Sequence, residues 1–245
     1  MLKSGFAAAA MLTAALAAVP ASAQTWNATT GFNTGLWSYV QRAGVGCAGA
    51  VTPLSIAYVG PTSTNFVGFH AVAAPVIVPL VAKNLAPSGT TVYSTAQIPA
   101  GAVWLHPGQT GANPQQCAAI RFRAPNAGTY RVKGFIKSID TGANKVNGYI
   151  FASNANTGPA LALSGPMGTA LNFDRIVTVP AGPPAGRTID FALNDGGSYF
   201  NDSTQLELSI TRCKGKNGKD AATGDASKPG SCGEPGDDNH NGDHH

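Results

Sequence analysis

The sequence predicts an all-β domain, an antiparallel β-sandwich of the jelly-roll type. Three observations lead to this fold class. Several segments alternate apolar and polar residues with a period of two, which is typical of half-buried strands. Turn-forming residues are abundant, with 30 Gly and 17 Pro in 245 residues. Charged residues make up only 11% of the chain, against about 25% in an average soluble protein, and no ten-residue stretch has a helical period.

The clearest strand is predicted at 205–211, where Leu206, Leu208 and Ile210 alternate with polar residues. The segment 188–193 repeats the pattern, and a turn cluster rich in Asn, Asp and Gly follows it. About ten short strands separated by such turns indicate a sandwich or jelly roll. Eight further strands are predicted at Leu36–Val40, Leu54–Val59, Asn65–His70, Ala102–His106, Cys117–Arg123, Thr129–Ile139, Val146–Ala152 and Asn172–Val179.

The two ends of the chain differ in composition from the domain, which spans 24–213. Residues 1–23 read as a signal peptide, with Lys3, an apolar run and the small residues Ala21 and Ala23 before a cleavage site at Gln24. The run is too short to span a bilayer, which needs about 20 apolar residues. Residues 214–245 form a Gly/Asp/Lys/His-rich tail without Val, Ile, Leu, Met or aromatic residues. We therefore expect a secreted protein, extracellular or periplasmic, with a disordered tail and no membrane segment after cleavage.

Four cysteines fit the same compartment, because disulfides persist where the environment is oxidising. An even number permits full pairing in three connectivities, and no Cys-x-x-Cys spacing points to a metal site. We favour a pair within the domain and a pair at its C-terminal edge. The predicted disulfides are Cys47–Cys117 and Cys213–Cys232.

Several short motifs resemble a recurring bacterial module. They lie at 37–39, 104–108, 120–134, 177–182, 188–191 and 197–204. Together they resemble the carbohydrate-binding-module-like jelly-roll domains of secreted and PEP-CTERM-type exported proteins, over about two thirds of the domain. The PEP-CTERM sorting signal itself is absent. The resemblance implies a non-enzymatic module without a defined ligand.

The sequence contains no convincing set of catalytic residues. Nucleophilic serine catalysis needs a base and an orienting acid, but the domain offers only His70 and His106 as bases and has no Gly-x-Ser-x-Gly motif. A glycosidase needs two carboxylates across a cleft, and three of the six acids of the domain fall in predicted turns, where Asp bonds its own backbone. We expect a non-catalytic binding, surface or extracellular-matrix protein that associates with glycans. The alternative is a polysaccharide-active hydrolase with a dispersed carboxylate pair.

A ladder of basic residues is the candidate binding site. If two consecutive strands pair through the turn at 125–128, five cations alternate onto one outer face. Such a face could hold an acidic polysaccharide or a cell-surface glycan. Nucleic acid is not an expected partner, because a net charge of +4 without a dense basic stripe is too weak. The five residues are Arg121, Arg123, Arg131, Lys133 and Lys137.

Other candidate ligands are explained equally well by ordinary structure, and no cofactor is expected. Asp195, Asn201 and Asp202 could converge on calcium, which prefers oxygen ligands, but turn chemistry accounts for them as well. The His and Asp residues of the tail read as a solubilising segment. Five aromatic residues are possible sugar platforms, although core packing is the expected role for most: Trp37, Tyr39, Trp104, Tyr149 and Tyr199.

Overall fold

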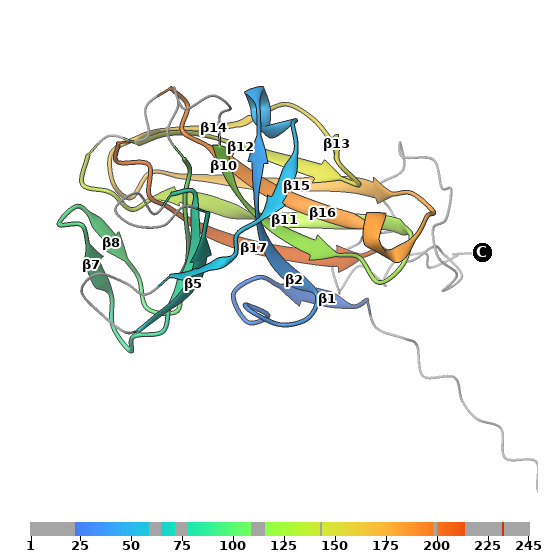
Figure 1. The fold of residues 1–245 in the computed structure, drawn as a ribbon, viewed down its shortest axis with the longest axis horizontal. Helices are drawn as coiled ribbons and strands as arrows, with labels where there is room; N and C mark the ends of the chain where they lie inside the picture. Colours follow the sequence, from blue (N-terminus) through green and yellow to red (C-terminus); the bar gives the residue numbers. More distant parts are fainter. Residues whose placement is uncertain are drawn as a thin grey trace, which may run out of the picture.

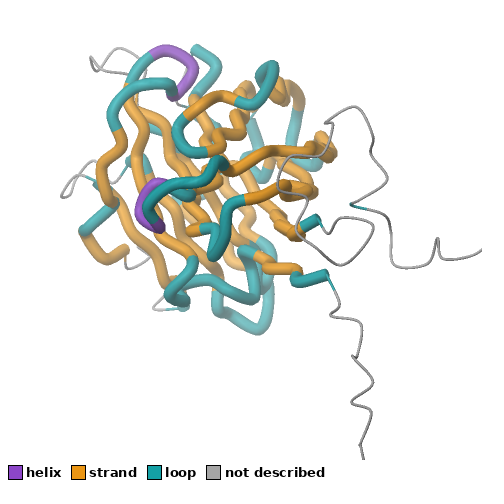
Figure 2. Tube along the Cα trace, turned by 90° about the vertical axis from the view of Figure 1, so that its right-hand side faces the viewer, coloured by secondary structure: helices purple, strands orange, loops and turns teal. Residues whose placement is uncertain are grey.

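A computed structural model describes residues 23–58, 65–71, 78–108, 116–142, 144–197, 200–213 and 232. The predicted signal peptide, apart from its last residue, lies outside the described residues. So does the predicted tail, apart from Cys232. Strands joined by loops and turns form this part of the chain, and helix is confined to two short turns (Figure 2), η1 (Val45–Cys47) and η2 (Pro184–Gly186). None of the helices in the described ranges is long and apolar enough to cross a membrane.

Two antiparallel sheets build the described part of the domain (Figure 1). The first sheet has the order β15-β11-β17-β9-β6-β5-β4, and β1 also pairs with β17. Its strands are β1 (Thr25–Asn27), β4 (Ile56–Tyr58), β5 (Phe66–His70), β6 (Leu80–Asn84), β9 (Val103–His106), β11 (Gly128–Ser138), β15 (Ala170–Val179) and β17 (Thr204–Arg212).

The second sheet has the order β13-β12-β16-β10-β2-β3, and β14 also pairs with β12. Its strands are β2 (Trp37–Ala43), β3 (Val51–Pro53), β10 (Gln116–Arg123), β12 (Asn144–Ala152), β13 (Ala155–Asn156), β14 (Leu161–Gly165) and β16 (Thr188–Asn194). A separate hairpin consists of β7 (Thr90–Val92) and β8 (Ala96–Ile98).

The predicted fold class is confirmed. Each of the ten predicted strands is a strand in the structure, with ends displaced by at most three residues. Leu206, Leu208 and Ile210 of β17 are buried, as the alternation predicted, and they pack in the main core between the sheets. The period of two therefore located these ten strands and the buried face of β17, whereas β16 is buried on both faces.

The predicted hairpin at 125–128 is wrong. The strand before the turn, β10, pairs with β2 and β16, whereas the strand after it, β11, pairs with β15 and β17. The turn carries the chain from one sheet to the facing sheet, so the rings of Phe122 and Tyr130 meet across the core with centroids 6.5 Å apart. A short Pro/Gly turn can join neighbouring strands or facing sheets, and the inward apolar residues on both strands favoured the second arrangement.

A second hydrophobic core covers half of the outer face of the first sheet. The hairpin β7–β8 lies beside β5 at one end of the domain (Figure 1), and Val92 and Ile98 of the hairpin pack with residues of the sheet, including Tyr58, Phe66 and Trp104. Trp104 is fully buried there. The half formed by β15, β11 and β17 stays open to solvent, and this half carries the candidate site.

A third, smaller apolar cluster lies on the outer face of the second sheet, where η1 folds over β10. The predicted disulfide Cys47–Cys117 is present at this point, with a Cα–Cα distance of 5.8 Å. Cys213 is bonded to Cys232, as also predicted. No free cysteine remains among the described residues.

Candidate functional site

The open face of the first sheet arranges its side chains in rows across three strands. In one row Asp174 of β15 is opposite Lys133 of β11, which is opposite Ser209 of β17. In the next row Asn172, Phe135 and Glu207 are aligned in the same way. Because the side chains of a strand alternate between faces, these six residues all point away from the core.

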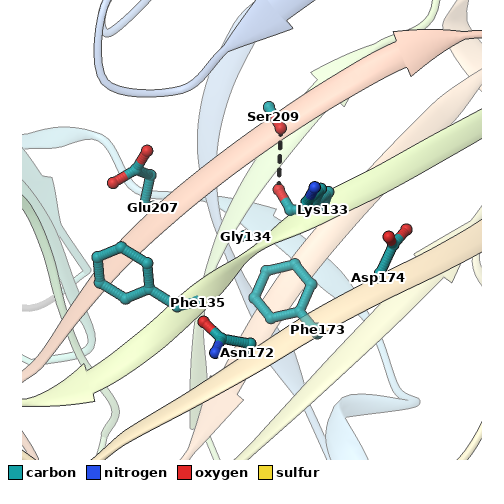
Figure 3. A pocket seen from close by; sticks show the side chains of 8 residues that line it. All are labelled: Lys133, Gly134, Phe135, Asn172, Phe173, Asp174, Glu207 and Ser209. Carbon is teal, nitrogen blue, oxygen red and sulfur yellow. Dashed lines mark hydrogen bonds between the residues drawn. The ribbon is translucent and has the colours of Figure 1, made fainter. Parts of the chain in front are cut away.

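A pocket of about 400 Å³ lies over these two rows and is open to solvent. Figure 3 shows the Phe135 and Phe173 rings at its centre, with Asn172 and Asp174 on the β15 side and Glu207 on β17. Gly134 lies beneath, where an added Cβ would overlap the carbonyl oxygen of Glu207. Since Gly134 has no side chain, the pocket reaches the edge of Phe173, whose ring stacks on Phe191 in the core with centroids 5.2 Å apart.

An ion pair borders the pocket. The Arg131 guanidinium donates through Nε to both oxygens of Asp174 at 2.9 and 3.1 Å and through Nη2 to Oδ2 at 2.6 Å. Its Nη1 donates to the backbone carbonyl of Cys232 at 3.2 Å. These hydrogen bonds lower the pKa of Asp174, so this carboxylate stays ionised and fixed in orientation.

The five predicted cations do not share one face. Arg131, Lys133 and Lys137 lie on β11 in the first sheet, and only Lys133 lines the pocket. Arg121 and Arg123 lie on β10 in the second sheet, on the opposite side of the sandwich. The prediction of one shared basic face was wrong, because it required a hairpin that does not form. Contact between a ligand and any single one of these side chains stays a prediction.

Asp174 and Glu207 are the two carboxylates that line the pocket. They lie on strands separated by β11 and one row apart. From standard strand spacings their Cα atoms are about 12 Å apart. A glycosidase raises the pKa of its proton donor, whereas the pKa of Asp174 is lowered by its hydrogen bonds to Arg131.

A second group of acids lies at the turns where β11 and β16 end. Asp140, Asp195 and Asp202 are all buried. Asp140 accepts a hydrogen bond from the Ser203 backbone at 2.6 Å, and Asp202 Oδ1 accepts one from the Lys145 backbone at 3.4 Å. Asp202 Oδ2 is buried without a hydrogen-bond partner. Burial, with smaller contributions from the charges of Asp195 and Asp140, raises the pKa of Asp202 to about 8.

The predicted calcium ligands are partly brought together here. Asp195 and Asp202 interact electrostatically, while the Asn201 amide packs against Gly142. In the part of the chain that the structure describes, no three His, Cys, Asp or Glu side chains form a metal-binding group. Calcium binding stays a prediction, and none of these residues lines the pocket on the open face.

Replacing Asp202 by Asn should remove the loss of stability that this carboxyl group causes as the pH rises from about 4 to about 8. An acid whose pKa is higher in the folded protein than in the unfolded chain favours folding below about pH 4, and this contribution is lost as the pH rises toward 8. At pH 9 the variant should be more stable by at least about 1 kcal/mol, or roughly 2–4 °C in Tm. Thermal unfolding of both proteins from pH 5 to 9, with EDTA present, measures the difference. Equal curves at every pH would contradict the raised pKa.

Sequence reasoning named other aromatic residues and missed Phe135. Trp37, Tyr39 and Trp104 are buried, Tyr149 packs against the small apolar cluster, and Tyr199 lies outside the described residues. A signal for Phe135 was present, because it has the outward parity of Lys133 and Lys137 on a strand whose Val132 and Ile136 are buried. The polar face of an alternating strand is an unusual position for an aromatic residue that packs in the core.

Comparisons with known proteins assign the chain to no family. No protein-family model and no curated protein matches the chain. Solved structures that are similar in fold include a family 35 carbohydrate-binding module from Clostridium thermocellum (11% identity, 63% of this chain, 89% of that chain, TM-score 0.28). An arabinose-bound α-L-arabinofuranosidase (12%, 79% and 30%, TM-score 0.38) and an exo-β-1,3-galactanase from Phanerochaete chrysosporium (13%, 71% and 32%, TM-score 0.27) are also similar.

Proposed function

We propose that this is a secreted, non-catalytic glycan-binding protein whose contact surface is the open face of the first sheet. One observation carries the proposal. A half-buried aromatic ring, Phe135, stands on an open sheet face among Asn172, Asp174, Glu207 and Ser209. A single ring surrounded by hydrogen-bonding groups fits a sugar, which has apolar C–H faces and a rim of hydroxyl groups.

The pocket has the composition of a binding site. Its volume of about 400 Å³ lies in the range of roughly 300–1,000 Å³ for small-molecule sites. Carboxylates accept hydrogen bonds from hydroxyl groups, and the Asn amide both donates and accepts. Because Arg131 holds Asp174 in place, that acceptor is oriented before a ligand arrives, which lowers the entropic cost of binding.

Binding by Phe135 is tested by replacing it with Ala. Loss of the ring should weaken retention in affinity gels containing polysaccharide by about tenfold, which corresponds to about 1.4 kcal/mol. Phe200→Ala is the matched control, because Phe200 is an exposed aromatic residue that does not line the pocket. A Phe135→Ala protein that folds and is retained as strongly as the parent would rule out this site.

Export is the second part of the proposal. The two disulfides fit an oxidising compartment outside the cytoplasm, and the predicted cleavage places Gln24 at the mature N-terminus. Mass spectrometry of the protein recovered from the periplasm and culture medium of an expressing bacterium should find Gln24 first. Recovery of a chain that still begins at Met1 would contradict export by this signal.

A further inference from the structure

We infer that the pocket on the open face takes an uncharged glycan rather than an acidic one. The inference rests on the proposed function and names the ligand class of the same site. It departs from the acidic ligand predicted from the sequence, which required five cations on one face. The arrangement of charges around Phe135 is what decides between the two ligand classes.

The pocket itself carries more negative than positive charge. Its charged side chains are one ammonium, Lys133, and two carboxylates, Asp174 and Glu207. A carboxylate on an acidic sugar would therefore meet Glu207 and, with its charge partly offset by Arg131, Asp174 within the space of two rows of side chains. Like charges brought together at a partly desolvated site oppose binding, whereas the hydroxyl groups of an uncharged sugar can donate to both carboxylates.

Arg131 is not available to receive an anion. Its Nε and Nη2 donate to Asp174, and its Nη1 donates to the carbonyl of Cys232. An acidic ligand would have to displace these bonds and would then leave Asp174 without its partner. The geometry makes Arg131 a positioning residue, which holds the Asp174 carboxylate while the remaining lone pairs of that carboxylate accept from a ligand.

The other predicted arginines cannot supply the missing positive charge. Arg121 lies on the second sheet, where its Nε and Nη2 each donate to Asp190 at 2.8 Å. Arg123 belongs to the same strand. Neither can reach the pocket through the core, so the electrostatic environment of the pocket is set by β11, β15 and β17.

Removing the charge of Glu207 should change the binding affinity in opposite directions for the two ligand classes. In Glu207→Gln the negative charge is lost but the shape is kept. For an uncharged glycan the variant should bind about 3- to 10-fold more weakly, because a hydrogen bond to a charged acceptor is stronger than one to an amide. For an acidic glycan it should bind more strongly, because a repelling charge is removed. Lys145→Gln is the control, since Lys145 is exposed on β12 of the second sheet and does not line the pocket.

The experiment compares affinity gels containing xylan, galactomannan or mixed-linkage β-glucan with gels containing polygalacturonate or alginate. Each gel is run from about 0.01 to about 1 M NaCl, which shortens the Debye length from about 30 to about 3 Å. We expect retention on an uncharged polysaccharide that changes less than about twofold with salt and is weakened by Glu207→Gln, with Lys145→Gln unchanged.

Retention confined to the acidic gels, lost in salt and strengthened by Glu207→Gln, would overturn the inference and leave the proposed function standing. Retention on an uncharged gel that Glu207→Gln does not weaken would also overturn it. Absence of retention on every gel would overturn both the inference and the proposed function. Thermal unfolding of each variant confirms that the proteins compared are folded.

Discussion

Replacing Asp190 by Ala is expected to lower the free energy of unfolding by about 3–5 kcal/mol, because it leaves buried positive charge without a partner. Asp190 is fully buried and accepts from two arginines, Arg42 at 2.6 Å and Arg121 at 2.8 Å. Arg42 is itself 1% exposed. It also donates to the Cys47 carbonyl at 2.6 Å and lies 3.8 Å from the centre of the Phe151 ring.

The electrostatics of Arg42 support this expectation. Burial lowers the pKa of Arg42, and Asp190 opposes that effect, so removal of Asp190 leaves only the unfavourable contribution. Asp174→Ala is the matched control, because the Arg131–Asp174 pair has similar geometry but side chains that are 25% and 42% exposed. Exposed pairs contribute about 0–1 kcal/mol. Urea unfolding measures both variants, and an equally small loss in each would show that burial of Asp190 has no such effect.

Removing the disulfide Cys47–Cys117 by replacing both residues with Ala is expected to cost about 4 kcal/mol. The bond closes a loop with a sequence separation of 70, and the loss of entropy that it imposes on the unfolded chain grows with loop length. It also holds η1 over β10, where the Cys47 carbonyl receives the hydrogen bond from Arg42. The double variant should therefore unfold at a clearly lower urea concentration.

The second disulfide offers a comparison within the same chain. Cys213 and Cys232 are separated by 19 positions, so the same relation gives about 3 kcal/mol for their removal. The Asp190 and Cys47–Cys117 changes should not be additive, because both act on Arg42, and residues that share a partner are coupled. A loss below about 1 kcal/mol on removing Cys47 and Cys117 would contradict the chain-entropy account.

The fold was predictable to the extent that it depends on local alternation. Leu206, Leu208 and Ile210 could be assigned to the core because a strand with one buried face records that face in its sequence. The path of the chain after Arg123 could not be assigned in the same way. Whether β11 returns beside β10 or crosses to the facing sheet depends on packing between residues far apart in the sequence, such as Phe122 and Tyr130.

The candidate site was less predictable for a related reason. The sequence shows that Arg121 and Arg131 are charged, but it does not show which residues pair with them. Asp190 and Asp174 lie far away in the sequence and come close to these arginines only because of how the strands are paired. From the sequence alone, an arginine on an outer face is expected to be available to a ligand. The structure changes this expectation when it places a carboxylate partner beside the arginine. Phe135 differed, since its outward parity was a local property that the sequence already contained.

The position of β10 has a consequence for how the domain reaches its structure. Ile120, at the middle of this strand, pairs with Tyr39 on one side and with Phe191 on the other. The partners come from early and late parts of the chain, so the centre of the second sheet cannot be completed until nearly the whole domain is available. Topologies dominated by such distant pairings fold slowly, in about milliseconds to seconds. During that interval the uncovered edges of β10 are open to pairing with other chains, and they are closed only when both β2 and β16 have paired with it.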